Sequence, residues 1–152
     1  MCRVKQWCAG GLFVLLASGQ AFAACTLSTT GLNFGTYDVF VTSAQSSTLT
    51  VTVNCTPQSP IAVLRLGPSA QSGGYAPRQM KHSSLPDRLS YNVYTDAAGT
   101  RVWGNGSSGT DVVVLRRIRV TPVTVLGYGK IVALQDVSAG IYTDVLTVTV
   151  LP

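Results

Sequence analysis

A strict alternation of polar and apolar side chains marks the segment Thr48-Leu49-Thr50-Val51-Thr52-Val53-Asn54-Cys55. Successive side chains of a β-strand point to opposite faces, so this period of two predicts a half-buried strand. The apolar residues of the segment, Cys55 included, fall on one face, and we expect that face to be buried. The turn-forming run Thr56-Pro57-Gln58-Ser59-Pro60 ends the strand.

The same period recurs along most of the chain. Further runs with strand character cover 61–66, 89–94, 111–125 with a break near Thr121-Pro122, and 142–151. The composition agrees, because the 152 residues include no Glu, three Lys and 37 Val or Thr, which favours strands over helices. About seven short strands in a chain of one-domain length predict an all-β fold, a sandwich of immunoglobulin-like type.

The first 23 residues have the features of a secretory signal peptide. Two basic residues precede a short apolar stretch, and Ala21-Phe22-Ala23 is a small-x-small cleavage site. We therefore expect residues 1–23 to be removed and residues 24–152 to form one exported domain. A lipoprotein signal that ends at Cys25 is the less favoured alternative. The apolar stretch is shorter than the roughly 20 residues that span a bilayer, so an integral membrane protein is not expected.

Cleavage leaves two cysteines, Cys25 and Cys55. In an exported chain, an isolated pair predicts a disulfide. A metal site is not expected, because two cysteines need further ligands to complete a tetrahedral zinc site and the only histidine is His82. Loss of the two basic residues of the signal peptide lowers the formal net charge from +5 to +3, and this small charge in an exported protein argues against nucleic-acid binding.

The sequence contains no recognisable set of catalytic residues. His82 lies in the polar run Met80-Lys81-His82-Ser83-Ser84, for which we expect loop structure, and no serine lies in a strand–turn–helix elbow. The six Asp are scattered, so paired carboxylates are not expected. The run Gly104-x-Gly106-x-x-Gly109 matches a phosphate-binding loop by letter only, since it precedes a strand. We expect neither enzymatic activity nor a cofactor.

The last predicted strand is unusual. The segment Val145-Leu146-Thr147-Val148-Thr149-Val150-Leu151 is long and apolar, and no further strand follows before Pro152. An uncovered strand of this kind is a template for aggregation unless another chain pairs with it. We therefore expect this edge to accept a strand from another polypeptide, as in pilin assembly.

Four motifs, in order, carry a resemblance to a known family. They are Leu32-Asn33-Phe34-Gly35-x-Tyr37, Leu89-Ser90-Tyr91-Asn92-Val93-Tyr94-Thr95-Asp96, Val102-Trp103-Gly104 and Ala139-Gly140-x-Tyr142-x-Asp144-x-Leu146-Thr147-Val148-Thr149-Val150. With the signal peptide and the cysteine pair, these motifs resemble the spore coat protein U domain family over essentially all of 25–151.

The resemblance implies a subunit of archaic chaperone–usher pili, which are surface fibres for adhesion and biofilm formation. It implies an incomplete immunoglobulin-like sandwich that lacks its last strand. In the family, donor-strand complementation supplies that strand: a periplasmic chaperone provides it first, and the N-terminal extension of the next subunit replaces it at an outer-membrane usher.

One feature departs from the family pattern. Subunits that polymerise carry an alternating extension before the first cysteine, whereas cleavage after Ala23 leaves only Ala24 ahead of Cys25. We therefore expect an acceptor-only subunit, minor or terminal in the fibre, although its single domain differs from the two domains common in the tip adhesins of the family.

The singled-out side chains have competing interpretations. We favour core or turn packing over sugar binding for the aromatic residues of the motifs, which are Phe34, Tyr37, Tyr91, Tyr94, Trp103 and Tyr142. Asp144 is expected to fix a turn or a cross-strand hydrogen bond. Arg116, Arg117 and Arg119 are expected to form a solvated or edge-protecting face rather than to bind an acidic partner. The competing function is a self-contained secreted module that binds a surface glycan or another surface ligand.

Overall fold

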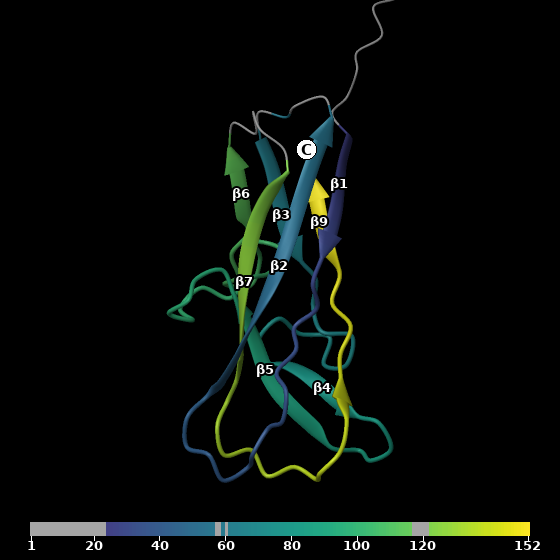
Figure 1. The fold of residues 1–152 in the computed structure, drawn as a ribbon, viewed down its shortest axis with the longest axis vertical. Coiled ribbons are helices and arrows are strands. Elements are labelled where there is room, and N and C mark those ends of the chain that lie inside the picture. Colours follow the sequence, from purple (N-terminus) through teal and green to yellow (C-terminus); the bar gives the residue numbers. More distant parts are fainter. Residues whose placement is uncertain (1–23, 57–58, 60, 117–121) are drawn as a thin grey trace, which may run out of the picture.

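Nine β-strands make up the fold in the computed structural model, which describes residues 24–56, 59, 61–116 and 122–152 (Figure 1). In chain order the strands are β1 (Ala24–Thr29), β2 (Gln45–Thr56), β3 (Ile61–Leu66), β4 (Arg78–His82), β5 (Arg88–Tyr94), β6 (Val113–Arg116), β7 (Val123–Ile131), β8 (Tyr142–Thr143) and β9 (Val148–Leu151). No helix occurs in these ranges, so the all-β prediction is confirmed. The expected signal peptide, Arg117, Arg119 and Thr121 lie outside the described residues.

The strands form two antiparallel sheets. The larger sheet has the order β1-β2-β7-β5-β4-β8, and the smaller sheet has the order β6-β3-β9. In the upper half of Figure 1, β2 and β7 cross in front of β3, while β5 and β4 continue the larger sheet below. The fold is a two-layer sandwich whose larger sheet extends beyond the smaller one.

Strand β2 lies at the centre of this sandwich because it pairs with both β1 and β7. The inner face that the alternation predicts is buried, with exposed fractions of 5% or less for its four apolar residues. That face packs with the inner residues of β3 and β5 and with Trp103 in one apolar core. The members of the core on these elements are Leu49, Val51, Val53, Cys55, Ala62, Leu64, Leu66, Leu89, Tyr91, Val93 and Trp103.

The predicted disulfide joins Cys25 and Cys55, which are directly opposite each other in β1 and β2. The strand β1 is not among the strands that the sequence analysis predicts. The disulfide closes a loop with a sequence separation of 30. In the chain-entropy model such a loop stabilises the fold by about 3 to 4 kcal/mol, and here it ties an edge strand to the core.

Strand β7 is longer than predicted, because it runs to Ile131 instead of ending at residue 125. Two glycines occupy its inner face and leave room for aromatic rings. A Cβ at Gly127 would lie 2.8 Å from the ring of Trp103, and a Cβ at Gly129 would lie 2.8 Å from the ring of Phe34. Glycine inside a strand commonly marks such a close approach.

The polar run around His82 is not a loop, contrary to the prediction. Residues 80–82 belong to β4, which pairs with β5 on one side and with β8 on the other. The buried residues of β4 are Arg78 and His82. Both are polar, so the strand lacks the apolar alternation that would reveal it.

The predicted strand 142–151 is also divided in two. Strand β8 pairs with β4 in the larger sheet, whereas β9 pairs with β3 in the smaller sheet. Residues 144–147 connect the two strands without belonging to either one. A segment that passes from one sheet to the other cannot keep a single ladder of hydrogen bonds.

Candidate functional site

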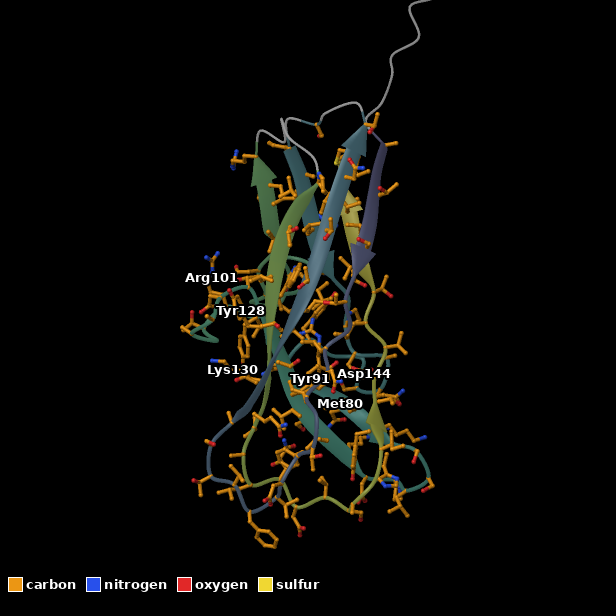
Figure 2. All side chains as sticks on the ribbon, viewed as in Figure 1. Met80, Tyr91, Arg101, Tyr128, Lys130 and Asp144 are labelled. Carbon is orange, nitrogen blue, oxygen red and sulfur yellow. A yellow bond between two sulfur atoms is a disulfide. The ribbon has the colours of Figure 1, made fainter. Side chains whose placement is uncertain are left out.

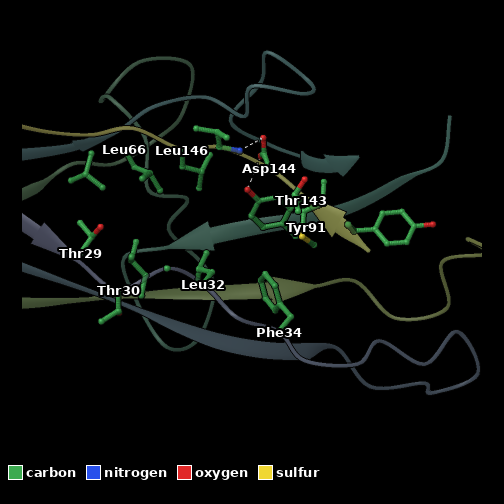
Figure 3. Close-up of a pocket in the computed structure, with 15 residues that line it drawn as sticks. Thr29, Thr30, Leu32, Phe34, Leu66, Tyr91, Thr143, Asp144 and Leu146 are labelled. Atoms are coloured by element: carbon green, nitrogen blue, oxygen red, sulfur yellow. Dashed lines mark hydrogen bonds between the residues drawn. The ribbon is translucent and has the colours of Figure 1, made fainter. Parts of the chain in front are cut away.

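Two strand edges border an open side of the sandwich. Strand β1 pairs with β2 and strand β9 pairs with β3, and within the described ranges neither has a second ladder. The chain that continues β1 and the chain that leads into β9 run along the two sides of the gap (Figure 3). Free strand edges are the places where a further strand can add to a sheet.

A groove of about 380 Å³ lies between these edges. Its floor is made by Leu49, Leu66, Met80 and Tyr91. A wider groove of about 670 Å³ continues it toward the loops at 35–39 and 137–141. We call the two together the edge groove. Its two parts share the lining residues Leu32, Phe34, Met80 and Tyr142.

Backbone hydrogen bonds leave polar groups of the segment before β9 directed at the edge groove. The N–H of Gly67 donates to the carbonyl of Thr147 at 2.8 Å, and the N–H of Ala70 donates to the carbonyl of Val145 at 3.3 Å. Backbone groups of an extended chain point alternately to its two sides. The N–H and C=O of Leu146 and Val148 therefore face the groove side, where an incoming strand would find them.

The predicted acceptor segment divides into an inward and an outward set. Leu146, Val148 and Val150 are half-buried and pack against the core, and the first two line the groove. The other members are exposed: Val145, Thr147, Thr149 and Leu151. Val145 nevertheless lines the rim of the groove although 67% of it is exposed.

Asp144 is the one charged residue among those that line the 380 Å³ part of the groove. The Tyr91 hydroxyl donates to its Oδ2 at 2.7 Å, and the backbone N–H of Val145 donates to its Oδ1 at 2.8 Å. Tyr91 is 3% exposed, and this burial, together with the bond to Asp144, raises the pKa of Tyr91. Tyr91 is therefore a neutral donor that holds the carboxylate against the floor of the groove.

Arg78 is a buried cation that the sequence analysis missed. Its side chain is fully buried, with Nη1 donating to the Tyr75 carbonyl at 2.9 Å and Nη2 donating to the carbonyls of Gly67 at 3.0 Å and Trp103 at 2.7 Å. Burial lowers the pKa of Arg78, while nearby acidic groups, Asp144 among them, oppose that shift. Its Nε has no hydrogen-bond partner in the described part of the chain. No pattern in the sequence separates this arginine from a surface arginine.

The aromatic residues of the motifs mostly pack inside the fold. Trp103 is fully buried and donates from Nε1 to a β3 carbonyl at 3.3 Å. Phe34 meets Tyr91 edge-on with 5.8 Å between ring centroids, and Gly35 follows it with a φ of 69°. The Tyr37 hydroxyl donates to the carbonyl of Val132 at 3.0 Å. These four residues lie where packing or turn formation explains them.

His82 anchors the loop that precedes β8. The ring is 5% exposed, with Nε2 at 3.2 Å from the Ala139 carbonyl, and Nδ1 accepts from the backbone N–H groups of residues 84–85. The Tyr142 ring meets the imidazole edge-on at 5.0 Å. A Cβ at Gly140 would overlap the imidazole, so the loop approaches His82 at a glycine. Both ring nitrogens are engaged by backbone groups.

Tyr94 lies apart from the edge groove, on the outer face of the larger sheet. It is directly opposite Tyr128 in the β5–β7 ladder, and Lys130 Nζ stands 5.8 Å from the centre of its ring. Lys130 also donates to the Ala98 carbonyl at 2.8 Å. Figure 2 shows Tyr128 and Lys130 on the flank opposite Asp144. A depression of about 280 Å³ lies beside them.

Neither a metal cluster nor a membrane span is found in the ranges that the structure describes. There, no three His, Cys, Asp or Glu side chains are grouped to hold a metal ion, and no helix is long and apolar enough to cross a bilayer. Arg116 is exposed on the edge strand β6, opposite Ile61. That position fits an edge-protecting arginine.

The fold and the site define a class: an all-β sandwich whose two sheets leave an apolar groove at an uncovered strand edge. The chain matches the Spore Coat Protein U domain over residues 12–149. It is 39% identical to Protein U of Myxococcus xanthus, over 78% of this chain and 70% of that relative. The protein therefore belongs to the Spore Coat Protein U domain family.

Solved structures share the fold. One is the CsuC–CsuE chaperone–tip adhesion subunit pre-assembly complex from archaic chaperone-usher Csu pili of Acinetobacter baumannii, with a TM-score of 0.57 and 19% identity, covering 85% of this chain and 40% of the matched chain. Another is the minor tip subunit HdaB of the E. coli Hda pilus, with a TM-score of 0.45 and 15% identity, covering 84% and 79%. This chain thus spans less than half of the matched Csu chain.

Proposed function

We propose that the protein is an exported structural subunit of a surface pilus of the archaic chaperone–usher type. In this proposal the edge groove accepts a strand from another polypeptide, which completes the immunoglobulin-like sandwich. The observation that carries the proposal is the conjunction of a free β9 edge with an apolar groove beside it. Membership of the Spore Coat Protein U domain family and the fold shared with a Csu pilus complex support it.

The chemistry of the groove suits an extended partner. The Leu146 and Val148 backbone groups offer hydrogen bonds to a strand, and their side chains, with Leu32 and Phe34 on the opposite wall, offer apolar contacts. Strand addition draws affinity from the backbone bonds and specificity from such side-chain contacts. The successive occupants in the proposal are a periplasmic chaperone and then a neighbouring subunit, exchanged at an outer-membrane usher, with adhesion and biofilm formation as the role of the fibre.

Periplasmic expression tests this proposal. We expect the chain alone to be degraded or aggregated and to be rescued when the chaperone of its own assembly system is produced with it. Leu146→Asp should abolish the rescue because it places a charge in the groove. Thr147→Asp is the matched control, since that side chain is exposed, and it should be rescued like the unchanged chain. A soluble monomer that unfolds cooperatively without a chaperone would contradict the proposal.

The finer proposal is that the subunit accepts a strand without donating one. Residues from Ala24 onward are committed to β1, and Cys25 is tied to β2, so the described N-terminal residues already belong to the subunit's own sheet. N-terminal sequencing of the exported protein is the test. We expect a mature start at Ala24, and a start ten or more residues before Cys25 would overturn the acceptor-only role.

Glycan binding by the outer face is the second candidate function. Tyr94, Tyr128 and Lys130 lie together beside the 280 Å³ depression, and aromatic faces with a nearby cation suit a sugar that carries a carboxylate. A Tyr128→Ala variant should lose binding on a glycan array if this surface is the site. Unchanged binding, or none in the parent chain, would count against it.

A further inference from the structure

One carboxylate interrupts an otherwise apolar and aromatic series along the wall of the edge groove. The half-buried residues from β8 to β9 alternate as Tyr142, Asp144, Leu146, Val148 and Val150. Four of these side chains are suited to contact with an apolar partner, and Asp144 is not. The inference that follows rests on the proposed function, because it concerns the strand that would fill the groove.

The Asp144 carboxylate is only partly satisfied by the protein. It accepts one hydrogen bond on each oxygen, from the Tyr91 hydroxyl and from the Val145 N–H. An ionised carboxylate offers about four acceptor positions, so roughly half of its capacity faces the groove. Figure 3 shows Asp144 beside Tyr91 at the wall of the groove. A strand that excludes water there without replacing the lost hydrogen bonds would leave buried acceptor positions unmade, which is costly.

The charge around Asp144 limits what the partner can bring. Arg78 lies fully buried in β4, and the mutual influence of the two groups is part of what sets the Arg78 pKa. The guanidinium gives its hydrogen bonds to three backbone carbonyls, so it compensates the carboxylate by its field and does not use up the free acceptor positions. A second cation would therefore meet the field of Arg78, whereas a neutral donor would not.

We propose that Asp144 selects a partner strand whose apolar inward series is interrupted at one position by a short, neutral hydrogen-bond donor, a hydroxyl or carboxamide side chain. Asp144 then determines the register of the added strand. An alternating apolar strand can slip by two residues and present the same face, and a single polar contact at a fixed point removes that freedom.

A fused strand tests this inference. The full chain is extended at Pro152 by a Gly/Ser linker and a strand of about nine residues, enough to cover the groove at roughly 3.3 Å per residue. In the reference strand every inward position is Val, and in the scan Thr replaces Val at one inward position at a time. Thermal unfolding midpoints are measured for each purified, exported fusion.

We expect Thr to lower the midpoint at every inward position but one, and to raise it there by roughly 3 to 6 °C, since one recovered hydrogen bond shifts a domain of this size by a few degrees. Lys at that position should raise it less than Thr. In the Tyr91→Phe/Asp144→Leu background, which removes both partners of the hydrogen bond together, Val should be best at every position.

The outcomes separate the two claims. If the all-Val strand stabilises the chain most at every position, or if the preference for Thr persists in the double variant, the role of Asp144 is overturned while strand acceptance stands. A Lys that exceeds Thr overturns the neutral character of the donor. If no fused strand changes the midpoint, the groove does not accept a strand, and the proposed function falls with the inference.

Discussion

Strands β2 and β9 share an alternation of threonine-rich and aliphatic positions, and they end in different environments. Strand β2 is paired on both sides, and its inward side chains are 5% exposed or less. Strand β9 is paired with β3 alone, and its inward residues Val148 and Val150 are only half-buried. Alternation therefore specifies which face of a strand turns inward, whereas the neighbours of the strand decide how deeply that face is buried.

A charge placed in each strand should give the largest effect and the sharpest contrast. Val51→Asp buries a carboxylate in a position that is fully buried in β2, so we expect a loss of about 4 kcal/mol or more, with no folded protein whether or not a strand is supplied. Val148→Asp should leave a partly folded chain and remove only the gain from an added strand. Urea unfolding with and without the fused strand measures both, and equal behaviour of the two variants would break the comparison.

Removal of the disulfide should have the next largest effect, because it frees the other bordering edge. The Cys25→Ser/Cys55→Ser chain should lose about 3 kcal/mol of unfolding free energy, from the loop that the disulfide closes. The loss should be smaller in the fusion, where an added strand also holds β1. Denaturant unfolding of both forms provides the measurement, and the same loss in both would mean that the added strand does not contact β1.

Gly140→Ala should cost about 1 to 3 kcal/mol, because the new methyl group overlaps the His82 imidazole and the loop before β8 must move. Gly31→Ala is the matched control, since a Cβ at Gly31 has no atom within 4 Å although this residue also lines the groove. It should be close to neutral. Thermal unfolding of the two single variants decides between a clash at His82 and a general sensitivity of the groove to added side chains.

The smallest expected effect concerns acid stability at the same loop. Hydrogen bonds from Ser138 lower the pKa of Asp87, and the backbone N–H of Ser138 lies 3.0 Å from Oδ2. A carboxyl group whose folded pKa is lowered stabilises the fold above its unfolded pKa, and this contribution disappears as the pH falls through the folded value. Asp87→Asn should therefore flatten the decline in stability below about pH 4 and leave its shape at pH 7 unchanged. Unfolding midpoints measured from pH 2 to pH 7 test this, and an unchanged acid slope would contradict it.

Several elements of the fold were predictable because each depends on short-range patterns. The inner face of β2, the all-β class and the pairing of Cys25 with Cys55 follow from alternation, composition and cysteine number. Strand β4 escaped prediction because its two buried residues are Arg78 and His82, whose partners lie far away along the chain. The extension of β7 escaped because its inner glycines are explained only by the rings that pack on them.

The groove was predictable in part. The segment around Val148 was identified as an edge from its position after the last turn, and the structure places Leu146 and Val148 on the wall of the groove. The opposite wall, formed by the chain after β1, has no pattern that relates it to β9. The Tyr91–Asp144 bond joins residues 53 positions apart, and sequence spacing does not reveal such a contact.

The sequence by itself determined that this chain forms short strands, which of their faces turn inward, and which two cysteines remain to pair. These properties depend on neighbours one or two residues away, where the pleat of a strand sets the direction of every side chain. Only the tertiary structure decided that the chain passes from one sheet to the other between β8 and β9, and that Asp144 and Arg78 meet near the groove. Those arrangements depend on which distant strands pair, because burial and compensation of a charge are properties of the assembled sandwich.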